Sequence, residues 1–394
     1  MYKRLGDYIR EVNVRNSDLK VTKPMGINIE KCFMPSVANV IGTDLSVYKL
    51  VSRNQFACNL MHVGRDEKIP VAMHTDDNPI IVSPAYFVFE ITKTKELLPE
   101  YLMMWFRRTE FDRNAWFYTD ADVRGGLNKD ALLDMRLPIP SIDRQREIVS
   151  EYETLSNRIR LNEQMIEKLE ATAQALYRKM FVDGVDMEKL PEGWKYSDLN
   201  SITELTTGGD WGKEEPEGNY TQKVLCLRGA DTPSLKHCKL GVIPTRYILP
   251  KNLKTRKLQP GDIVVEISGG SPTQSTGRSA QMNMIVDSYY ECDIICSNFC
   301  RMVRPKRPYA DFYYAAFNNL FMRDVFFRYE NSTNGLKNLN LDAVLTEEKM
   351  VIPSNDVAIE FSKQITIINN NINYLGQEQD KLTELLELFL TKLA

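Results

Sequence analysis

The sequence predicts an α+β protein in which two modules of mixed strands and helices are separated by two long helices that pair as an antiparallel coiled coil. Two observations predict this class. Apolar residues recur in alternating steps of four and three along 141–184 and along 354–394, at one constant offset of 213 residues. Short strand-like runs punctuated by Gly and Pro fill the stretches between them. The expected domains are therefore a first module over 1–140, a helix over 141–184, a second module over 185–353 and a helix over 354–394.

Composition places the chain among ordinary folded proteins. Of its 394 residues, 43% are hydrophobic and 26% are charged. No apolar run approaches the roughly 18 residues of a membrane span, and the N-terminus has no signal-peptide core, so we expect a cytoplasmic protein. The net charge of −3 means that any nucleic-acid surface must be a local patch.

The heptad seam is continuous over four and a half heptads in both helices, which is typical of a coiled coil. In the first helix the seam residues are Ile148, Tyr152, Leu155, Ile159, Asn162, Ile166, Leu169, Ala173, Leu176 and Met180. In the second they are Phe361, Ile365, Ile368, Ile372, Leu375, Gln379, Leu382, Leu386, Phe389 and Leu393. Ser141 and Ser354 are candidate N-caps, and Gly184 is a natural stop for the first helix.

One polar residue in each seam predicts the direction of pairing. A parallel pair would place Asn162 opposite Leu375 and Gln379 opposite Ile166. An antiparallel pair over the full length places Asn162 opposite Gln379, where the two amides can bond each other. An unpaired buried amide costs about 1–3 kcal/mol, so we expect the antiparallel arrangement. The alternative is two unrelated amphipathic core helices.

The modules themselves carry a trace of duplication. Gly126–Leu133 matches Asn338–Leu345 at an offset of 212, next to the helices at 213, so the repeat unit is a module plus its helix. The chain is thus a tandem repeat with an expected pseudo-two-fold axis. An antiparallel helix pair would hold the modules at opposite ends and return the C-terminus to the first module.

A search for catalytic motifs finds none. The Gly269–Arg278 loop lacks the Gly-Lys-Ser/Thr of a P-loop, and no Asn/Asp-Pro-Pro-Tyr/Phe methyltransferase motif is present. Asp262 and Glu266 have nuclease-like spacing, but Ser268 stands where that pattern needs lysine. The three histidines are scattered and the seven cysteines lack paired Cys-x-x-Cys spacing, so neither a catalytic group nor a metal site is expected.

The polar residues that remain suit DNA binding. The Gly269–Arg278 loop is rich in Gly, Ser, Thr and Gln, which allows close approach to a phosphate backbone and contacts to base edges. Arg53-Asn54-Gln55 and Gly64-Arg65 are the candidates for the same role in the first module. The predicted DNA-binding residues are Arg53, Asn54, Arg65, Arg124, Arg228, Thr273, Gln274, Ser275, Arg278, Asn334 and Lys337. The alternative for each single charge is a solvated surface residue.

In this order and spacing, four stretches make the chain resemble the specificity subunits of type I restriction–modification systems. These stretches are Leu190–Trp194 (LPEGW), which opens the second module, Leu137–Val149, which opens the first helix, Tyr48–Asp66, and Lys257–Ile263. The resemblance covers essentially the whole chain. The sequence departs from the family pattern at Tyr2–Asp7, which has no Leu-Pro-x-Gly-Trp lead-in, at Val351–Pro353, where the second module ends, and at Val357–Glu360, which replaces an Arg-Gln-Arg-Glu box. The last departure questions whether both helices contact the partner alike.

The resemblance implies a non-catalytic subunit that reads the two halves of an asymmetric, interrupted DNA site. It implies two adenine-N6 methyltransferase subunits as partners, with restriction (translocase) subunits as optional ones. S-adenosylmethionine, ATP and Mg are expected on those partners, with no cofactor on this chain. The helix pair would set the gap between half-sites and offer its outer face to the methyltransferase. Two alternatives are a coiled-coil adaptor whose modules bind protein and a stand-alone nucleic-acid enzyme.

Overall fold

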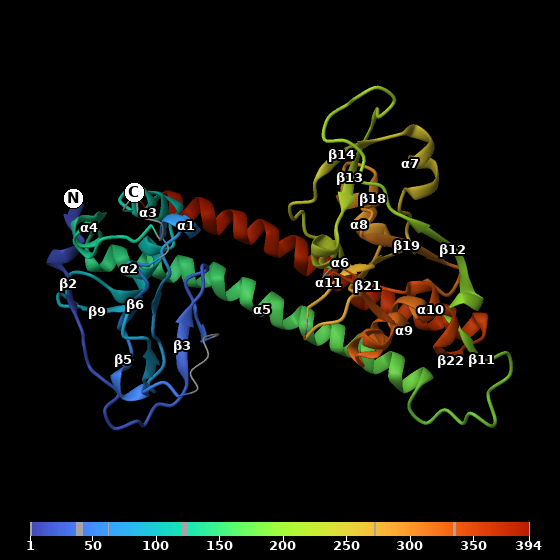
Figure 1. Ribbon diagram of the computed structural model, residues 1–394, viewed down its shortest axis with the longest axis horizontal. Helices are drawn as coiled ribbons and strands as arrows, with labels where there is room; N and C mark the ends of the chain where they lie inside the picture. Colours follow the sequence, from blue (N-terminus) through green and yellow to red (C-terminus); the bar gives the residue numbers. More distant parts are fainter. Residues whose placement is uncertain are drawn as a thin grey trace. The chain divides into compact units, whose positions relative to one another are not determined.

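The computed structural model describes residues 2–36, 42–61, 63–119, 125–271, 273–333 and 336–393. The chain divides into two compact units, unit 1 with Met1–Arg158 and Leu382–Ala394, and unit 2 with Ile159–Lys381. Both long helices, α5 (Ile142–Phe181) and α11 (Asn355–Thr391), contribute segments to both units (Figure 1). The α+β class with two long paired helices is as predicted. The predicted domain limits at 140, 184 and 353 stay predictions.

Unit 1 is built on two small sheets. The first is antiparallel, in the order β2–β9–β6–β7, and the second, β4–β3–β8–β5, contains one parallel pair, β3 with β8. Stacked Phe56 and Phe89 on neighbouring strands, 5.1 Å between ring centroids, form the centre of its core. The strands are β1 (Tyr2–Arg4), β2 (Ile9–Glu11), β3 (Pro24–Ile27), β4 (Phe33–Pro35), β5 (Lys49–Val51), β6 (Phe56–Cys58), β7 (Val71–Met73), β8 (Ile80–Val82), β9 (Phe87–Ile91) and β10 (Arg136–Pro138). The helices are η1 (Leu5–Asp7), η2 (Leu45–Val47), α1 (Val63–Asp66), α2 (Pro99–Phe106), α3 (Thr109–Phe117) and α4 (Lys129–Asp134).

Unit 2 repeats this plan with insertions. Its antiparallel sheet β12–β19–β15–β17 has the strand order of β2–β9–β6–β7, and its sheet β14–β13–β18 again contains a parallel pair. The strands are β11 (Lys195–Asp198), β12 (Thr203–Gly208), β13 (Gln222–Leu227), β14 (Thr245–Ile248), β15 (Ile263–Glu266), β16 (Ser268–Gly269), β17 (Ser279–Gln281), β18 (Ile294–Cys296), β19 (Cys300–Pro305), β20 (Glu330–Thr333), β21 (Leu336–Leu339) and β22 (Lys349–Ile352). The helices are η3 (Leu199–Ile202), η4 (Gly229–Asp231), α6 (Thr232–His237), α7 (Pro250–Arg256), α8 (Met284–Tyr289), α9 (Ala310–Met322), η5 (Val325–Tyr329) and α10 (Leu341–Glu347).

The predicted repeat is visible in how each module joins its long helix. Asn128 caps α4 and Asn340 caps α10, each accepting a backbone N–H with its side chain. The strand that follows pairs in each case with the first strand of the module, β10 with β1 and β22 with β11. Each of these strand pairs leads directly into a long helix, so module and helix are one repeated unit.

The two long helices pair antiparallel within each unit. In unit 2 the end of α5 meets the start of α11, with Phe181 and Phe361 rings 5.1 Å apart, and the two helices run side by side (Figure 1). In unit 1 the start of α5 shares a core with the end of α11, through Tyr152 and Leu390. Leu5 belongs to that same core, so the C-terminal end of α11 packs on the first module as expected. All twenty predicted seam residues are buried or half-buried.

The predicted hydrogen bond between the two seam amides is wrong in detail. Asn162 and Gln379 are both buried, at 2% and 3% exposure. Asn162 donates to Glu378 Oε2 at 2.7 Å, and Gln379 donates to the backbone oxygen of Ile159 at 3.1 Å. A carboxylate is a stronger acceptor than an amide, so the neighbouring Glu378 takes the Asn162 donor. The antiparallel pairing survives, but a different bond satisfies each donor.

The departure from the family pattern at the second helix has a structural counterpart. Gln145 is fully buried and donates to the backbone oxygens of Glu96 (2.7 Å) and Pro140 (2.9 Å), while its Oε1 accepts the Leu98 N–H (2.9 Å). The equivalent position in α11 is buried Ala358, which can make no such bonds. In unit 2 the Tyr309 hydroxyl donates to the backbone oxygen of Pro353 at 3.1 Å instead. Each helix start is therefore anchored to its module by different side chains.

Candidate nucleic-acid interface

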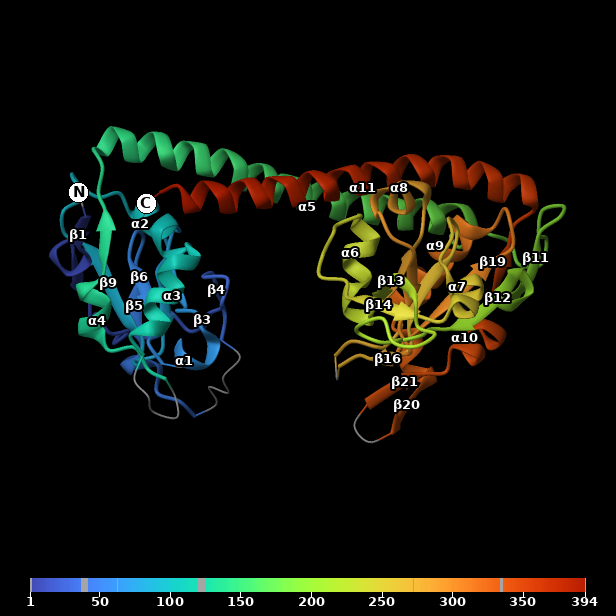
Figure 2. The ribbon, with the colours of Figure 1, turned by 90° about the horizontal axis from the view of Figure 1, so that it is seen from above.

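The glycine-rich loop of unit 2 is joined to a hairpin that sequence patterns did not predict. β16, at the start of the loop, pairs with β21, and β21 pairs with β20. Lys337 on β21 lies 2.9 Å from the Glu330 carboxylate and donates to the backbone oxygen of Ser271 at 2.8 Å. This hairpin lies on the side of unit 2 away from α5 and α11 (Figure 2). The structure thus brings Lys337 together with the predicted loop.

Glu330 fixes the middle of the loop. It accepts the Thr276 backbone N–H as well as pairing with Lys337. Burial favours its neutral form, but these two partners outweigh burial and lower the pKa of Glu330. The carboxylate is therefore ionised and ties the loop to the hairpin.

The Glu266 carboxylate fixes the end of the loop, as Glu330 fixes its middle. Arg278 donates to both of its oxygens, at 2.9 and 2.6 Å, and this hydrogen bonding raises the pKa of Arg278. Gly229 and Gly269 lie directly against the carboxylate, since a Cβ would be 2.2 Å from Oε1 at Gly229 and 2.6 Å at Gly269. Only glycine allows this close approach. The Arg228–Gly229 turn, the Gly269 turn and Arg278 therefore meet at one buried carboxylate.

The remaining predicted DNA-binding residues of unit 2 differ in whether their side chains are exposed and free of protein contacts. Thr273 and Gln274 are exposed, whereas Ser275 is 2% exposed. Arg228 is bound to Asp231 through two bonds of 2.9 Å. Asn334 lies outside the described residues. Gln274 and Thr273 are thus the side chains most free to meet a ligand.

Unit 1 has an equivalent of this surface. The Leu127 N–H donates to the backbone oxygen of Leu60 at 2.9 Å, just as the Leu339 N–H donates to that of Ile267 at 2.9 Å in unit 2. In unit 1 this contact brings Gly64 against Gly125, with N–H to O at 2.7 Å. The predicted Gly64–Arg65 pair and the glycine-rich loop thus occupy corresponding places.

The predicted residues of unit 1 do not form one cluster. Arg65 is exposed and bonds the neighbouring Asp66 at 2.7 Å. Arg53 and Asn54 lie in the turn that precedes β6, whereas Arg65 follows β6, so they are at opposite ends of that strand. Asn54 adopts a left-handed φ of 63°, and exposed Arg53 bonds Asp77 at 2.6 Å. Arg124 lies outside the described residues.

The carboxylates with nuclease-like spacing have structural partners. Asp262 accepts two bonds of 2.7 Å from Arg304, and Glu266 is held by Arg278. Among the residues that the structure describes, no group of three His, Cys, Asp or Glu side chains is arranged to hold a metal ion. No helix in the described part of the chain has the length and apolar character needed to span a bilayer.

Sequence reasoning missed an apolar edge on the long helices. With the seam at heptad positions a and d, the helices bury e positions against the modules, for example Tyr177 and Gly376, and α11 also buries Asn373 at a b position. The opposite c and g positions carry exposed apolar side chains. In unit 2 these are Leu161, Met165, Ile367 and Tyr374, and in unit 1 they are Leu385 and Leu388. The sequence signal for this edge is a second set of apolar residues, at c and g positions, that recurs with the same heptad spacing as the seam.

Comparison with known proteins defines first the class of the fold. Over its full length the chain superimposes on 95% of the crystal structure of a type I restriction–modification S subunit from M. genitalium, with a TM-score of 0.57 and 12% identity. The fold is that of a type I specificity subunit.

In sequence, the chain is similar to curated specificity subunits. It is 31% identical over 207 residues, half of this chain, to the type I restriction enzyme HindI specificity subunit of Haemophilus influenzae, covering 44% of that protein. It is 30% identical over 121 residues, 30% of this chain, to the EcoKI specificity subunit of Escherichia coli K12, covering 24% of that protein. The chain therefore matches less than half the length of these relatives. No family model matches it.

Proposed function

We propose that the chain is the non-catalytic DNA-recognition subunit of a type I restriction–modification complex and that each unit reads one half of an asymmetric, interrupted site. One observation carries this proposal. The two units hold the same loop-on-strand element by corresponding hydrogen bonds, Leu127 to Leu60 and Leu339 to Ile267, but present different polar residues from it. A repeated scaffold with different surface side chains is what two different half-sites require.

The coiled coil supports the second part of the proposal, which concerns the partners. Leu161 and Met165 on α5, with Ile367 and Tyr374 on α11, are all at c or g positions. Because the two helices are antiparallel, the g positions of both helices lie on the same edge of the pair. These four side chains therefore form one apolar strip in unit 2. Exposed apolar strips of this kind mark protein interfaces. We assign the strip to helices of an adenine-N6 methyltransferase subunit, two copies of which would bind per chain.

This chain supplies neither cofactor nor catalytic group in the proposal. S-adenosylmethionine would be held by the methyltransferase subunits, and ATP with Mg by restriction subunits where the system has them. The complex would act in the cytoplasm, where its DNA substrate lies.

The test of DNA reading uses the chain together with its methyltransferase subunit. Selection from a random duplex library should enrich two separate groups of bases, and binding should weaken with salt. Gln274→Ala should change one group only, and Gln164→Ala, at an exposed position of α5 off the apolar strip, should change neither. Enrichment of no sequence, or an identical sequence from Gln274→Ala, would contradict the assignment of the loop.

The test of the partner surface uses charge insertion. Leu161→Glu with Met165→Glu should abolish co-purification of the methyltransferase while the chain stays folded, because two carboxylates would be buried in an apolar contact. Gln164→Glu, on the same helix but off the strip, is the matched control. Methyltransferase binding that survives the double change would contradict the partner assignment and, if DNA selection also fails, would favour a protein-binding adaptor.

A further inference from the structure

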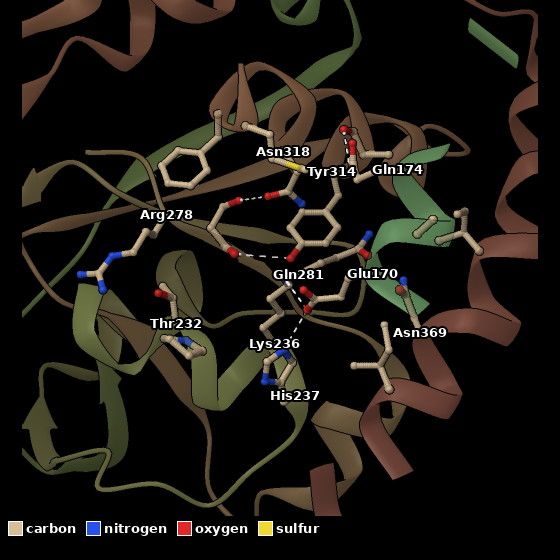
Figure 3. Close-up of a pocket in the computed structure, with 18 of the residues that line it drawn as sticks. Glu170, Gln174, Thr232, Lys236, His237, Arg278, Gln281, Tyr314, Asn318 and Asn369 are labelled. Atoms are coloured by element: carbon tan, nitrogen blue, oxygen red, sulfur yellow. Dashed lines mark hydrogen bonds and ion pairs between the residues drawn. The ribbon is translucent and has the colours of Figure 1, made fainter. Parts of the chain in front are cut away.

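Unit 2 contains a cavity that borders the glycine loop, because Gln274 and Arg278 contribute to its lining. Its volume is 560 Å³, within the range of small-molecule sites. Its walls come from α5, α6, α9 and α11, and Figure 3 shows Gln174, Gln281, Tyr314 and Asn369 around it. All of its lining residues belong to unit 2.

Two carboxamides in this wall are oriented with their oxygens unpaired. Gln174 donates its amide to the Ala315 backbone oxygen at 3.3 Å, and Gln281 bonds the Asp311 carboxyl. These bonds fix the NH₂ end of each amide. The Oε1 atoms of Gln174 and Gln281 are buried without a hydrogen-bond partner among the described residues, and Gln281 is 6% exposed. Two buried acceptors of this kind favour an occupant that carries N–H or O–H donors.

Each cation in the wall of the cavity has a carboxylate partner. Glu170 accepts from His237 at 2.8 Å and from Lys236 at 2.8 Å. Burial alone would raise the pKa of Glu170, but the His237 hydrogen bond and the Lys236 charge outweigh it and lower this pKa to about 2. Arg278, the other cation of the wall, is held by Glu266. No cation of the described wall is left for a phosphate, so the site favours a neutral ligand.

The rest of the wall suits a flat ring. Tyr314 and Phe321 are aromatic, and Ile365 and Ile372 add aliphatic surface. The side chain of Asn369, on α11, also lines the cavity and makes no hydrogen bond within the described part of the chain (Figure 3). A free Asn or Gln amide can pair with the N6 and N7 edge of adenine, donating and accepting at once.

We propose that this cavity binds a neutral purine with an exocyclic amino group, the chemistry of adenine. The amino group would donate to an unpaired Gln oxygen, the ring would lie against the aromatic wall, and Asn369 would meet a second polar edge. The ligand would bridge the helix pair and the second module. The proposal does not depend on sequence-specific DNA reading, because a free nucleoside or an adenine presented by a nucleic acid carries the same group.

Calorimetric titration of the full chain tests this inference with two probes, adenosine and a short single-stranded deoxyadenosine oligonucleotide. Inosine, which lacks the amino group, should bind adenosine's site about tenfold more weakly, and AMP should bind no tighter than adenosine. Gln281→Met and Gln174→Met should each weaken the responding probe about tenfold, because each removes an acceptor at similar size. Gln364→Met, outside the cavity, should change nothing. Gln174 is less buried than Gln281, so Gln174→Met should be better tolerated. If Gln281→Met fails to fold, the Gln174→Met variant provides the test.

The two probes separate the sources of the ligand. Binding of adenosine that both glutamine variants weaken assigns the site to a free nucleoside. Sensitivity of the oligonucleotide alone assigns it to a base presented by nucleic acid. If neither probe binds up to about 1 mM, or if the variants leave binding unchanged, the cavity is a water-filled space and the inference is wrong.

Discussion

Gln145 offers the sharpest test of how the first module is fixed to its helix. Its side chain is fully buried and satisfies three backbone groups, the N–H of Leu98 and the oxygens of Glu96 and Pro140. Leu98 is the N-cap residue of α2 and has no side-chain cap of its own, so Gln145 supplies a missing partner at the start of that helix. Gln145→Leu keeps the volume but leaves all three groups unpaired.

The magnitude follows from those three groups. Each unpaired buried polar group costs about 1–3 kcal/mol, and the carbonyls cost least, so we expect a loss of about 3–5 kcal/mol in the free energy of unfolding of unit 1. That is a large part of the roughly 5–15 kcal/mol that stabilises a typical domain. The substitution leaves the unit 2 anchor, the Tyr309 bond to Pro353, untouched.

Urea unfolding followed by hydrogen exchange of the full chain measures this effect unit by unit. Peptides covering α2 and β1 should lose protection at lower urea in Gln145→Leu, while peptides from unit 2 should not. Gln164→Leu, exposed on the same helix, is the matched control. A loss below about 0.5 kcal/mol in unit 1 would refute the claim that these three bonds anchor the module.

Three further predictions follow from individual contacts. Because Asn162 and Gln379 bond other groups, Asn162→Leu should lower the free energy of unfolding by about 1 kcal/mol and Gln379→Leu should hardly change it. In a double-mutant cycle measured by urea unfolding, the two effects should add within about 0.5 kcal/mol. Strong coupling between the two substitutions would mean that the amides bond each other. Because the pKa of Glu170 is lowered in the folded state, its ionised form adds about 3 kcal/mol to the free energy of unfolding above its ordinary pKa near 4.3, and this stability is lost as the pH falls towards 2. Glu170→Gln should therefore reduce the drop in the unfolding midpoint between pH 5 and pH 3. An unchanged drop would contradict this prediction. Glu266→Gln should destabilise unit 2 by about 2–3 kcal/mol, because Arg278 loses its charged partner. It should also reduce the sequence preference at one half-site in DNA selection. Unaltered selection would show that Arg278 does not position the loop.

The long helices could be predicted because a seam with a fixed period needs no knowledge of the rest of the fold. The period placed both helices and the polar seam residues gave their direction. It could not give the partners of Asn162, because Glu378 lies outside the seam and competes through its charge. The second module shows a similar limit. Aromatic and aliphatic residues are frequent from Ala310 to Tyr329, but helix α9 ends at Met322, and after it Asp324 adopts a left-handed φ of 57° and a 3-10 turn follows.

The candidate site was predictable in its composition but not in its geometry. Loop residues such as Gln274 stand out by residue type, and the structure leaves Gln274 exposed. Burial of Ser275 and the ion pair of Arg278 with Glu266 depend on contacts between distant segments, which no local pattern reveals. The separation of Arg53 from Arg65 likewise follows from the path of β6 through the sheet.

The most direct measurement is a map of N6-methyladenine by long-read sequencing in cells that carry this gene with its methyltransferase. We predict a two-part, interrupted motif that disappears when the gene is deleted. In a Gln274→Ala strain the motif should change in one half and keep its gap. A methylation map that is the same with and without the gene, in cells where the complex is shown to assemble, would contradict the claim that this chain specifies the DNA sequence.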